Sequence, residues 1–232
     1  GSSAALATLV KGSFSDRLEE ENLVTLLNDR DWQKRRASLS ALEKILSGSR
    51  EIDGDPEQDQ TLKGLFEALL ERLDDSNKKL VRQTLLVLCY FPPLMKKQNV
   101  DKLSEQMFGD ILGSLTDTKS WIVTPGLKAM SAFADHVSDF SVIAPAVSKF
   151  LSEAASTTRL HLLTWLTQQY NVVDRVLSTK SEQTKLSAKI MVSAVLDSLQ
   201  DKNATVRQIA EDLLEPMMRL VHFDVIKAHF RK

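Results

Sequence analysis

Two groups of residues in this sequence have types and spacing that could do chemistry. His222 and His229 lie seven residues apart, but no thiolate or carboxylate stands at a supporting position, so they predict no metal site. The segment Asp29–Arg36, DRDWQKRR, sets a tryptophan before three cations within four residues. Tryptophan and arginine are enriched where proteins bind one another. This segment therefore predicts a protein-binding surface.

Motifs for catalysis are missing elsewhere in the chain. The sequence contains no GxGxxG or GxxxxGK[ST] loop for a nucleotide phosphate, no HExxH metal motif and no GxSxG nucleophile elbow. The single cysteine, Cys89, excludes an internal disulfide and a zinc site built on cysteines. Within LLVLCYF it is expected to be a small buried apolar residue. We therefore expect no cofactor, no metal and no enzymatic activity.

Composition favours a soluble, helix-rich protein. The 232 residues are 43% hydrophobic and 26% charged, with eight glycines and six prolines, and β-branched residues do not alternate over any long run. A net charge of −1 argues against a nucleic-acid partner. The longest apolar run, Leu85–Met95, is interrupted by Pro92-Pro93 and is too short to span a membrane. These features predict a cytosolic or nuclear protein without a membrane partner.

An internal repeat indicates which elements position the cationic segment. The pattern Leu-x-Asp ends at Asp29, Asp75, Asp117 and Asp201, at intervals of 46, 42 and 84 residues. Because 84 is twice 42, one repeat with a degenerate turn is expected near residue 157. A period in the low forties with two helices per unit is typical of HEAT repeats. We predict an all-α HEAT-repeat solenoid of about five to six helix pairs.

The apolar periodicity and the polar breaks give approximate bounds for these pairs. We expect residues 1–14 to be an expression-tag scar and a lead-in, and residues 15–232 to form the helical array. The first helix is expected to begin at Ser15 or Asp16, and its partner to stop at Ser47–Ser49. The five pairs are expected at 16–48, 59–91, 100–136, 140–170 and 183–222, with the start of a sixth at 223–232.

Stacked helix pairs present two edges of loops, which differ in their expected charge. The connectors between pairs are acidic, most clearly at 51–57, whereas the turns within pairs are rich in cations and tryptophan. This distribution predicts a turn edge suited to an acidic protein partner. Its members are expected to be Arg30, Trp32, Lys34, Arg35, Arg36, Lys78, Lys79, Arg82, Lys119, Trp121, Arg159, Lys202 and Arg207.

Several of these residues have a structural interpretation as well. Trp165 shares a helical face with His161 and Leu162 and is expected in the core. Trp121 fits the core or the edge. Trp32 has polar neighbours, which favours an interface anchor over partial packing against the turn. Arg82 and Arg207 follow valines, as in the ladders that join HEAT repeats, so both a structural and a binding role remain open.

Five short segments together resemble a known family. They are DWQKR at 31–35, DSNKKLV at 75–81 followed by QTL, DTK at 117–119, Arg159 with LTWL at 163–166, and DKNATVR at 201–207. Over nearly the whole chain, and in this order, they resemble a TOG domain. TOG domains are the tubulin-binding HEAT arrays of the ch-TOG/Mini spindles microtubule polymerases, with relatives in the CLASP group. The segments at 75–85 and 159–166 are most similar to the fourth TOG domain of the animal polymerase.

The resemblance implies a function and a set of contact residues. It implies a non-catalytic, monomeric domain that binds αβ-tubulin or the microtubule lattice, within a cytoplasmic regulator located on microtubules, the spindle and its poles. The implied tubulin-facing residues are Trp32, Lys34, Arg35, Asn77, Lys78, Lys79 and Val81 in the first two turns, then Lys119, Arg159, Lys202, Asn203 and Arg207.

The third turn departs from the family pattern, and one alternative function stays open. Ile122-Val123 stands where a basic residue usually continues this turn, so the middle of the edge is expected to differ in its contribution. The alternative from another class is a HEAT-repeat scaffold or adaptor that binds peptides or helices on its concave face.

Overall fold

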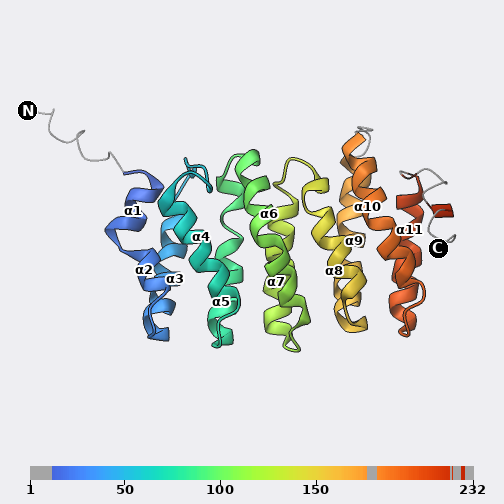
Figure 1. The fold of residues 1–232 in the computed structure, drawn as a ribbon, viewed down its shortest axis with the longest axis horizontal. Coiled ribbons are helices and arrows are strands. Elements are labelled where there is room, and N and C mark those ends of the chain that lie inside the picture. The colour runs from blue at the N-terminus through green and yellow to red at the C-terminus, as the bar shows by residue number, and fades with distance from the viewer. Residues whose placement is uncertain (1–11, 177–181, 220, 222–225, 228–232) are drawn as a thin grey trace, which may run out of the picture.

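The chain folds into a row of helices that stand side by side, with its N-terminal and C-terminal helices at opposite ends (Figure 1). The computed structural model describes residues 12–176, 182–219, 221 and 226–227. These residues form eleven α-helices and three short 3-10 helices, and they contain no strand. The predicted all-α solenoid is confirmed.

Five successive helix pairs make up the described part of the array. In the first pair, α1 (Phe14–Glu20) and α2 (Leu23–Leu27) precede α3 (Trp32–Ser47). The next pairs are α4 (Gln60–Leu73) with α5 (Lys78–Leu88), and α6 (Lys97–Gly113) with α7 (Ser120–Ala134). The last two are α8 (Ala144–Glu153) with α9 (Ser156–Val176), and α10 (Glu182–Ser198) with α11 (Ala204–Met218). The 3-10 helices are η1 (Pro92–Leu94), η2 (Ser114–Thr116) and η3 (Phe140–Val142).

The pairs stack so that first helices and second helices form two layers. In one layer α4 contacts α2 and α6, and α8 contacts α6 and α10; in the other, α5 contacts α3 and α7, and α9 contacts α11. The core lies between the layers and includes Phe66, Phe91, Phe108 and Phe133, all fully buried. Trp165 is also buried, with its ring centroid 6.3 Å from that of Phe108, which confirms its predicted place in the core.

The start of the array differs from the sequence prediction. The first helix begins at Phe14, and its N-cap is Ser13 in a capping box with Asp16, so neither Ser15 nor Asp16 is the cap. Asn22 adopts a left-handed conformation with φ 50° and separates α1 from α2, a backbone geometry that asparagine tolerates better than most residues. The predicted stop at Ser47–Ser49 is confirmed, since α3 ends at Ser47.

Two further expectations concern the ends of the chain and the crossing of a membrane. Most of the expected sixth helix pair, and residues 1–11 of the expected lead-in, lie outside the described residues. Of the helices that the structure describes, none combines the length and apolarity needed to cross a membrane.

Candidate protein-binding edge

The repeated aspartate of Leu-x-Asp shapes each turn within a helix pair. In all four copies its Oδ1 accepts a hydrogen bond from the backbone N–H two residues later, which is an Asx turn. This shared role explains why the pattern recurs in the sequence. The donor–acceptor distances are 2.8 Å for Asp31 to Asp29, 2.9 Å for Asn77 to Asp75, 2.9 Å for Lys119 to Asp117 and 2.8 Å for Asn203 to Asp201.

The residue that donates to this aspartate is also the N-cap of the second helix. Asp31, Asn77 and Asn203 cap α3, α5 and α11, each accepting from the backbone N–H two positions on, at 2.8, 3.1 and 2.9 Å. Equivalent caps start these helices in the same register. Asn77 and Asn203, both predicted as contact residues, therefore have a structural role in the turn.

Cations from one helix pair reach the Asx aspartate of the next pair. Arg35 binds Asp75 through Nε and Nη2, and Lys78 Nζ lies 3.5 Å from the carboxylate of Asp117. Arg159 forms the corresponding ion pair with Asp201. These pairs join the first repeat to the second, the second to the third and the fourth to the fifth. Part of the predicted cationic surface thus holds the array together.

Three predicted contact residues have little or no accessible side chain as a result. The side chain of Arg35 is 13% exposed and that of Arg159 is 19% exposed, and both guanidinium groups form these ion pairs. Val81 is 3% exposed and packs in the core. We correct the predicted surface accordingly: Arg35, Arg159 and Val81 support the edge from inside.

The first turn does present its tryptophan to solvent. Trp32 is the first residue of α3 and is 41% exposed. Lys34, whose side chain is 55% exposed, lies two residues further on, and its Nζ is 3.0 Å from Asp29 Oδ2. The pKa of Asp29 is lowered, first by the Asp31 backbone N–H and then by Lys34. The turn therefore offers an aromatic surface beside a cation.

The later turns add exposed cations to this edge. Lys78, Lys79, Lys119, Lys202 and Arg207 are all exposed. Arg207 and Arg35 share one kind of contact, because the Nη1 of each donates to two backbone carbonyls of its own turn. For Arg207 these are the carbonyls of Asp201 and Lys202, at 2.7 and 3.2 Å. Arg207 thus combines a structural contact with an exposed side chain, so its two predicted roles are compatible.

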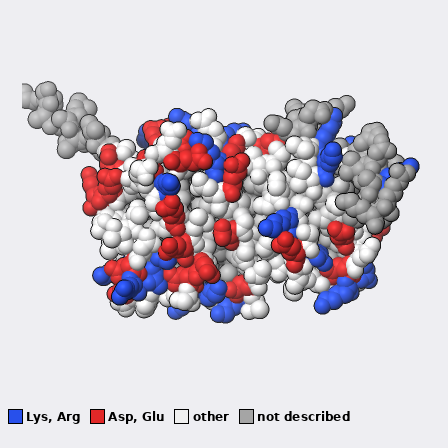
Figure 2. Space-filling view, viewed as in Figure 1, with Lys and Arg blue, Asp and Glu red and all other residues white. Residues whose placement is uncertain are grey.

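The predicted separation of charge between the two edges is wrong. Figure 2 shows Lys and Arg mixed with Asp and Glu along the edge that carries the turns and along the opposite one. On the turn edge the acidic groups include the Asx aspartates, of which Asp29 and Asp117 are partly exposed and Asp75 and Asp201 are buried. On the connector edge Lys102 lies 2.5 Å from Asp55 and 3.0 Å from Glu57, and it contributes most to the lowered pKa of Asp55.

The structure resolves the role left open for Trp121. This residue, second in α7, is 41% exposed and belongs to the edge, and Lys119 Nζ lies 5.5 Å from its ring centroid. Ile122 and Val123 point into the core. The third turn therefore replaces the expected basic continuation with an exposed tryptophan beside a lysine. The sequence signal was the tryptophan at a helix start, the same position that exposes Trp32.

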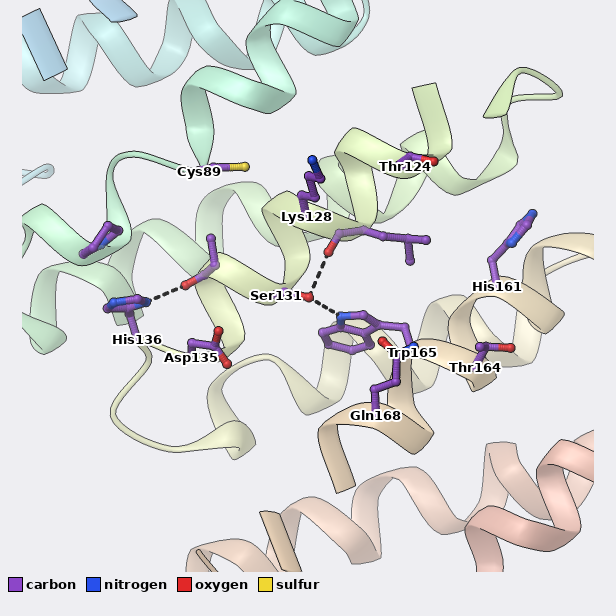
Figure 3. Close-up of a pocket in the computed structure, with 13 residues that line it drawn as sticks. Cys89, Thr124, Lys128, Ser131, Asp135, His136, His161, Thr164, Trp165 and Gln168 are labelled. Atoms are coloured by element: carbon purple, nitrogen blue, oxygen red, sulfur yellow. Dashed lines mark hydrogen bonds between the residues drawn. The ribbon is translucent and has the colours of Figure 1, made fainter. Parts of the chain in front are cut away.

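A hollow of about 580 Å³ between α7 and α9 brings a serine, a cysteine and two histidines together (Figure 3). Ser131 Oγ donates to the Leu127 carbonyl at 3.0 Å and accepts from Trp165 Nε1 at 2.9 Å. The His136 ring instead faces the Ala132 carbonyl, with Nδ1 2.8 Å from the carbonyl oxygen. His161 lies on the opposite side of the hollow, at the right in Figure 3. The serine and the histidines thus do not form a nucleophile–base pair.

The remaining titratable groups give no stronger candidate. Cys89 also lines this hollow, and burial raises the pKa of its thiol to about 11, which disfavours the reactive thiolate. Across the described residues, no group of three or more His, Cys, Asp or Glu side chains is placed to hold a metal ion. The arrangement with the clearest chemical meaning is therefore the turn edge, where exposed tryptophans stand among cations.

A family model and several curated proteins match this sequence. The model described as CLASP N terminal matches residues 17–221. Centrosomal protein 224 of Dictyostelium discoideum is 25% identical over 83% of this chain and 9% of its own length. Protein MOR1 of Arabidopsis thaliana is 28% identical over 99% of this chain and 11% of its own length. Protein mini spindles of Drosophila melanogaster is 26% identical over 89% and 10%. The chain thus spans about a tenth of these relatives.

Solved structures share the fold at low sequence identity. One comes from work on microtubule plus-end tracking by XMAP215, CLIP-170 and EB1; its TM-score is 0.71, with 16% identity over 93% of this chain and 86% of that one. Another comes from work on tubulin recruitment and assembly by microtubule polymerases with TOG domain arrays, with a TM-score of 0.69 and 15% identity over 88% and 42%. Both similarities support the same helical-repeat architecture.

Proposed function

Because the chain belongs to the CLASP N-terminal family and has the fold of a TOG domain, we propose that it is a non-catalytic module that binds tubulin. Within a longer regulator of microtubule dynamics, it would hold a tubulin dimer or a lattice subunit while other regions of that protein bind the microtubule. Linking such sites raises the effective concentration of tubulin near the growing lattice. We place the parent protein in the cytoplasm, on microtubules, the spindle and its poles.

The observation that carries this proposal is the exposure of Trp32 on an edge that shows exposed cations at successive turns. The exposed ring of a tryptophan has a large apolar surface, and burying that surface against a partner is favourable. Tryptophan is also enriched at interface hot spots. The cations at the second, third and fifth turns would steer and orient an acidic surface. The proposed contact set is Trp32, Lys34, Asn77, Lys78, Lys79, Lys119, Lys202, Asn203 and Arg207.

The comparisons support tubulin as the partner. A solved structure with this fold comes from work on tubulin recruitment by microtubule polymerases, and the matched relatives include a centrosomal protein and mini spindles. The closer similarity to a fourth TOG domain remains a prediction from the segments at 75–85 and 159–166.

Gel filtration with purified tubulin, together with co-sedimentation with assembled microtubules, tests the proposal. We expect the chain to be a monomer on its own, and to elute with tubulin or to sediment with microtubules. The scaffold alternative instead predicts no association with either form. It also predicts that the chain binds a peptide or helix and that this binding is sensitive to substitutions on the concave face of the array.

A further inference from the structure

A second cavity, of about 540 Å³, begins at the turn edge and extends over the layer of second helices. Helix α3 contributes residues at positions i, i+4 and i+7, and α5 contributes a matching row, so the two helices form its walls. Trp121, from the start of α7, lines one side. The lining residues are Arg36, Ser40, Glu43, Lys79, Leu80, Arg82, Gln83, Leu86 and Trp121.

The charge of this cavity is predominantly positive. Arg36 in α3 and Lys79 and Arg82 in α5 are all exposed. The one carboxylate, Glu43, already accepts a hydrogen bond of 3.3 Å from the Tyr90 hydroxyl. A ligand that enters the cavity therefore meets three cations and one carboxylate that has a donor of its own.

The walls of the cavity are joined, and one of them is aromatic. Gln83 Nε2 donates to Ser40 Oγ at 2.9 Å, which links α5 to α3 across the cavity. The ring of Trp121 is 41% exposed, and Lys119 adds a fourth cation 5.5 Å from its centroid. Trp121 can thus stack against a planar group while the surrounding cations bind carboxylates.

We propose that this cavity binds an extended acidic segment of a protein partner, with carboxylates paired to Arg36, Lys79 and Arg82 and a planar side chain stacked on Trp121. Charge complementarity identifies the occupant, because guanidinium groups bind carboxylates in a planar, two-point geometry. The cavity shares Lys79 with the proposed tubulin contacts, and Lys119 lies beside it over the Trp121 ring, but the cavity does not include Trp32. A substitution at Trp32 therefore tests this inference separately from tubulin binding.

Fluorescence anisotropy with a labelled peptide tests this proposal directly. The probe is a fluorescein-tagged peptide with glutamates on both sides of one tyrosine, titrated with the 232-residue chain at an ionic strength of about 0.15 M, where charges more than about 8 Å apart are largely screened. We expect Arg82→Glu to weaken binding by at least about tenfold, since it replaces an attraction by a repulsion. Trp121→Ala should weaken binding several-fold. Lys44→Glu, an equal charge change at an exposed position of α3 outside the cavity, should change the affinity by less than about twofold.

Further variants keep the test decisive. Arg36→Glu repeats the charge reversal from the other wall, and circular dichroism identifies any variant that fails to fold. Trp32→Ala, which adds no charge beside Arg36, should bind the peptide normally, whatever its effect on tubulin. The proposal is overturned if the native chain does not bind the peptide, or if Lys44→Glu and Arg82→Glu weaken it equally. It also fails if an oligouridylate of equal charge binds as tightly and Trp121→Ala has no effect, which would indicate a general polyanion surface.

Discussion

Arg35 and Asp75, forty residues apart in the sequence, form a two-point ion pair across the boundary between the first and second helix pairs. Arg35 Nε lies 2.9 Å from Asp75 Oδ2, and Nη2 lies 3.2 Å from Oδ1. The same guanidinium donates through Nη1 to the backbone carbonyls of Asp29 and Arg30, at 2.8 and 3.0 Å. Arg35 thus fastens its own turn and the neighbouring one, while Lys34 beside it faces solvent.

The first prediction concerns stability. Asp75→Ala should lower the free energy of unfolding by about 3 kcal/mol, because it leaves Arg35 and the nearby Arg72 without their buried partner. For a chain of this size that corresponds to a fall of roughly 6 to 12 °C in Tm, measurable by circular dichroism. Lys34→Ala is the control and should change the stability by less than about 0.5 kcal/mol. Equal shifts for the two variants would contradict the structural role of the pair.

A second prediction separates binding from stability at the second turn. Lys79→Glu should weaken tubulin binding while Tm stays unchanged, because Lys79 is exposed and the ion pair to Asp117 is made by Lys78. The loss should be larger at low salt than at high salt, since exposed charges are screened. Lys63→Glu, at an exposed position of α4, serves as the control. A loss independent of salt, or one equalled by the control, would argue against a direct contact.

Acid sensitivity should be traceable to Asp201. Burial raises the pKa of this carboxyl, but the Asn203 backbone N–H, the Ser156 hydroxyl and Arg159 together outweigh it, so the folded-state pKa is lowered. A lowered folded-state pKa stabilises the fold above the unfolded value of about 3.9, and this contribution is lost as the pH falls through the folded-state pKa.

Urea unfolding at several pH values tests this assignment. The native chain should be more stable than Asp201→Asn at pH 7, and the difference should shrink as the pH falls below about 4. A difference that stays constant down to pH 2 would show that the charge of Asp201 does not contribute.

Cys89 should react slowly as long as the fold is intact. Its pKa of about 11, raised by burial, leaves about a hundredfold less thiolate at pH 8 than a thiol with the ordinary value of 9.0. Reaction with Ellman's reagent at pH 8 should therefore be about a hundredfold slower in buffer than in denaturing urea. Similar rates in both solvents would mean that the hollow between α7 and α9 opens readily.

The repeat architecture could be predicted because its signal lies within each turn. Leu-x-Asp combines a core leucine with an aspartate that folds the turn, so its spacing reported the helix pairs directly. The break at Asn22 has no such signal, because a left-handed asparagine is also compatible with a polar position on a continuous helix.

The division of the cations into exposed and internal ones could not be predicted. Lys34 and Arg35 are adjacent in DRDWQKRR, and only the packing of the second repeat places Asp75 next to one of them. Arg159 raises the same difficulty, since its partner Asp201 is 42 residues away. The position of Trp121 could not be predicted either. Its place at a helix start fitted both core and edge, and only the burial of Ile122 and Val123 places Trp121 at the edge.

The central claim is that Trp32 anchors a tubulin-binding edge, and a tubulin affinity measured for Trp32→Glu tests it most directly. The matched control is Leu186→Glu, which places the same charge at an exposed apolar residue of α10, 48% exposed against 41% for Trp32. We predict that Trp32→Glu raises the Kd for tubulin by at least about 30-fold, as for a hot spot of about 2 kcal/mol, with an unchanged circular dichroism spectrum, while Leu186→Glu binds normally. Equal binding by the native chain and Trp32→Glu would contradict the account.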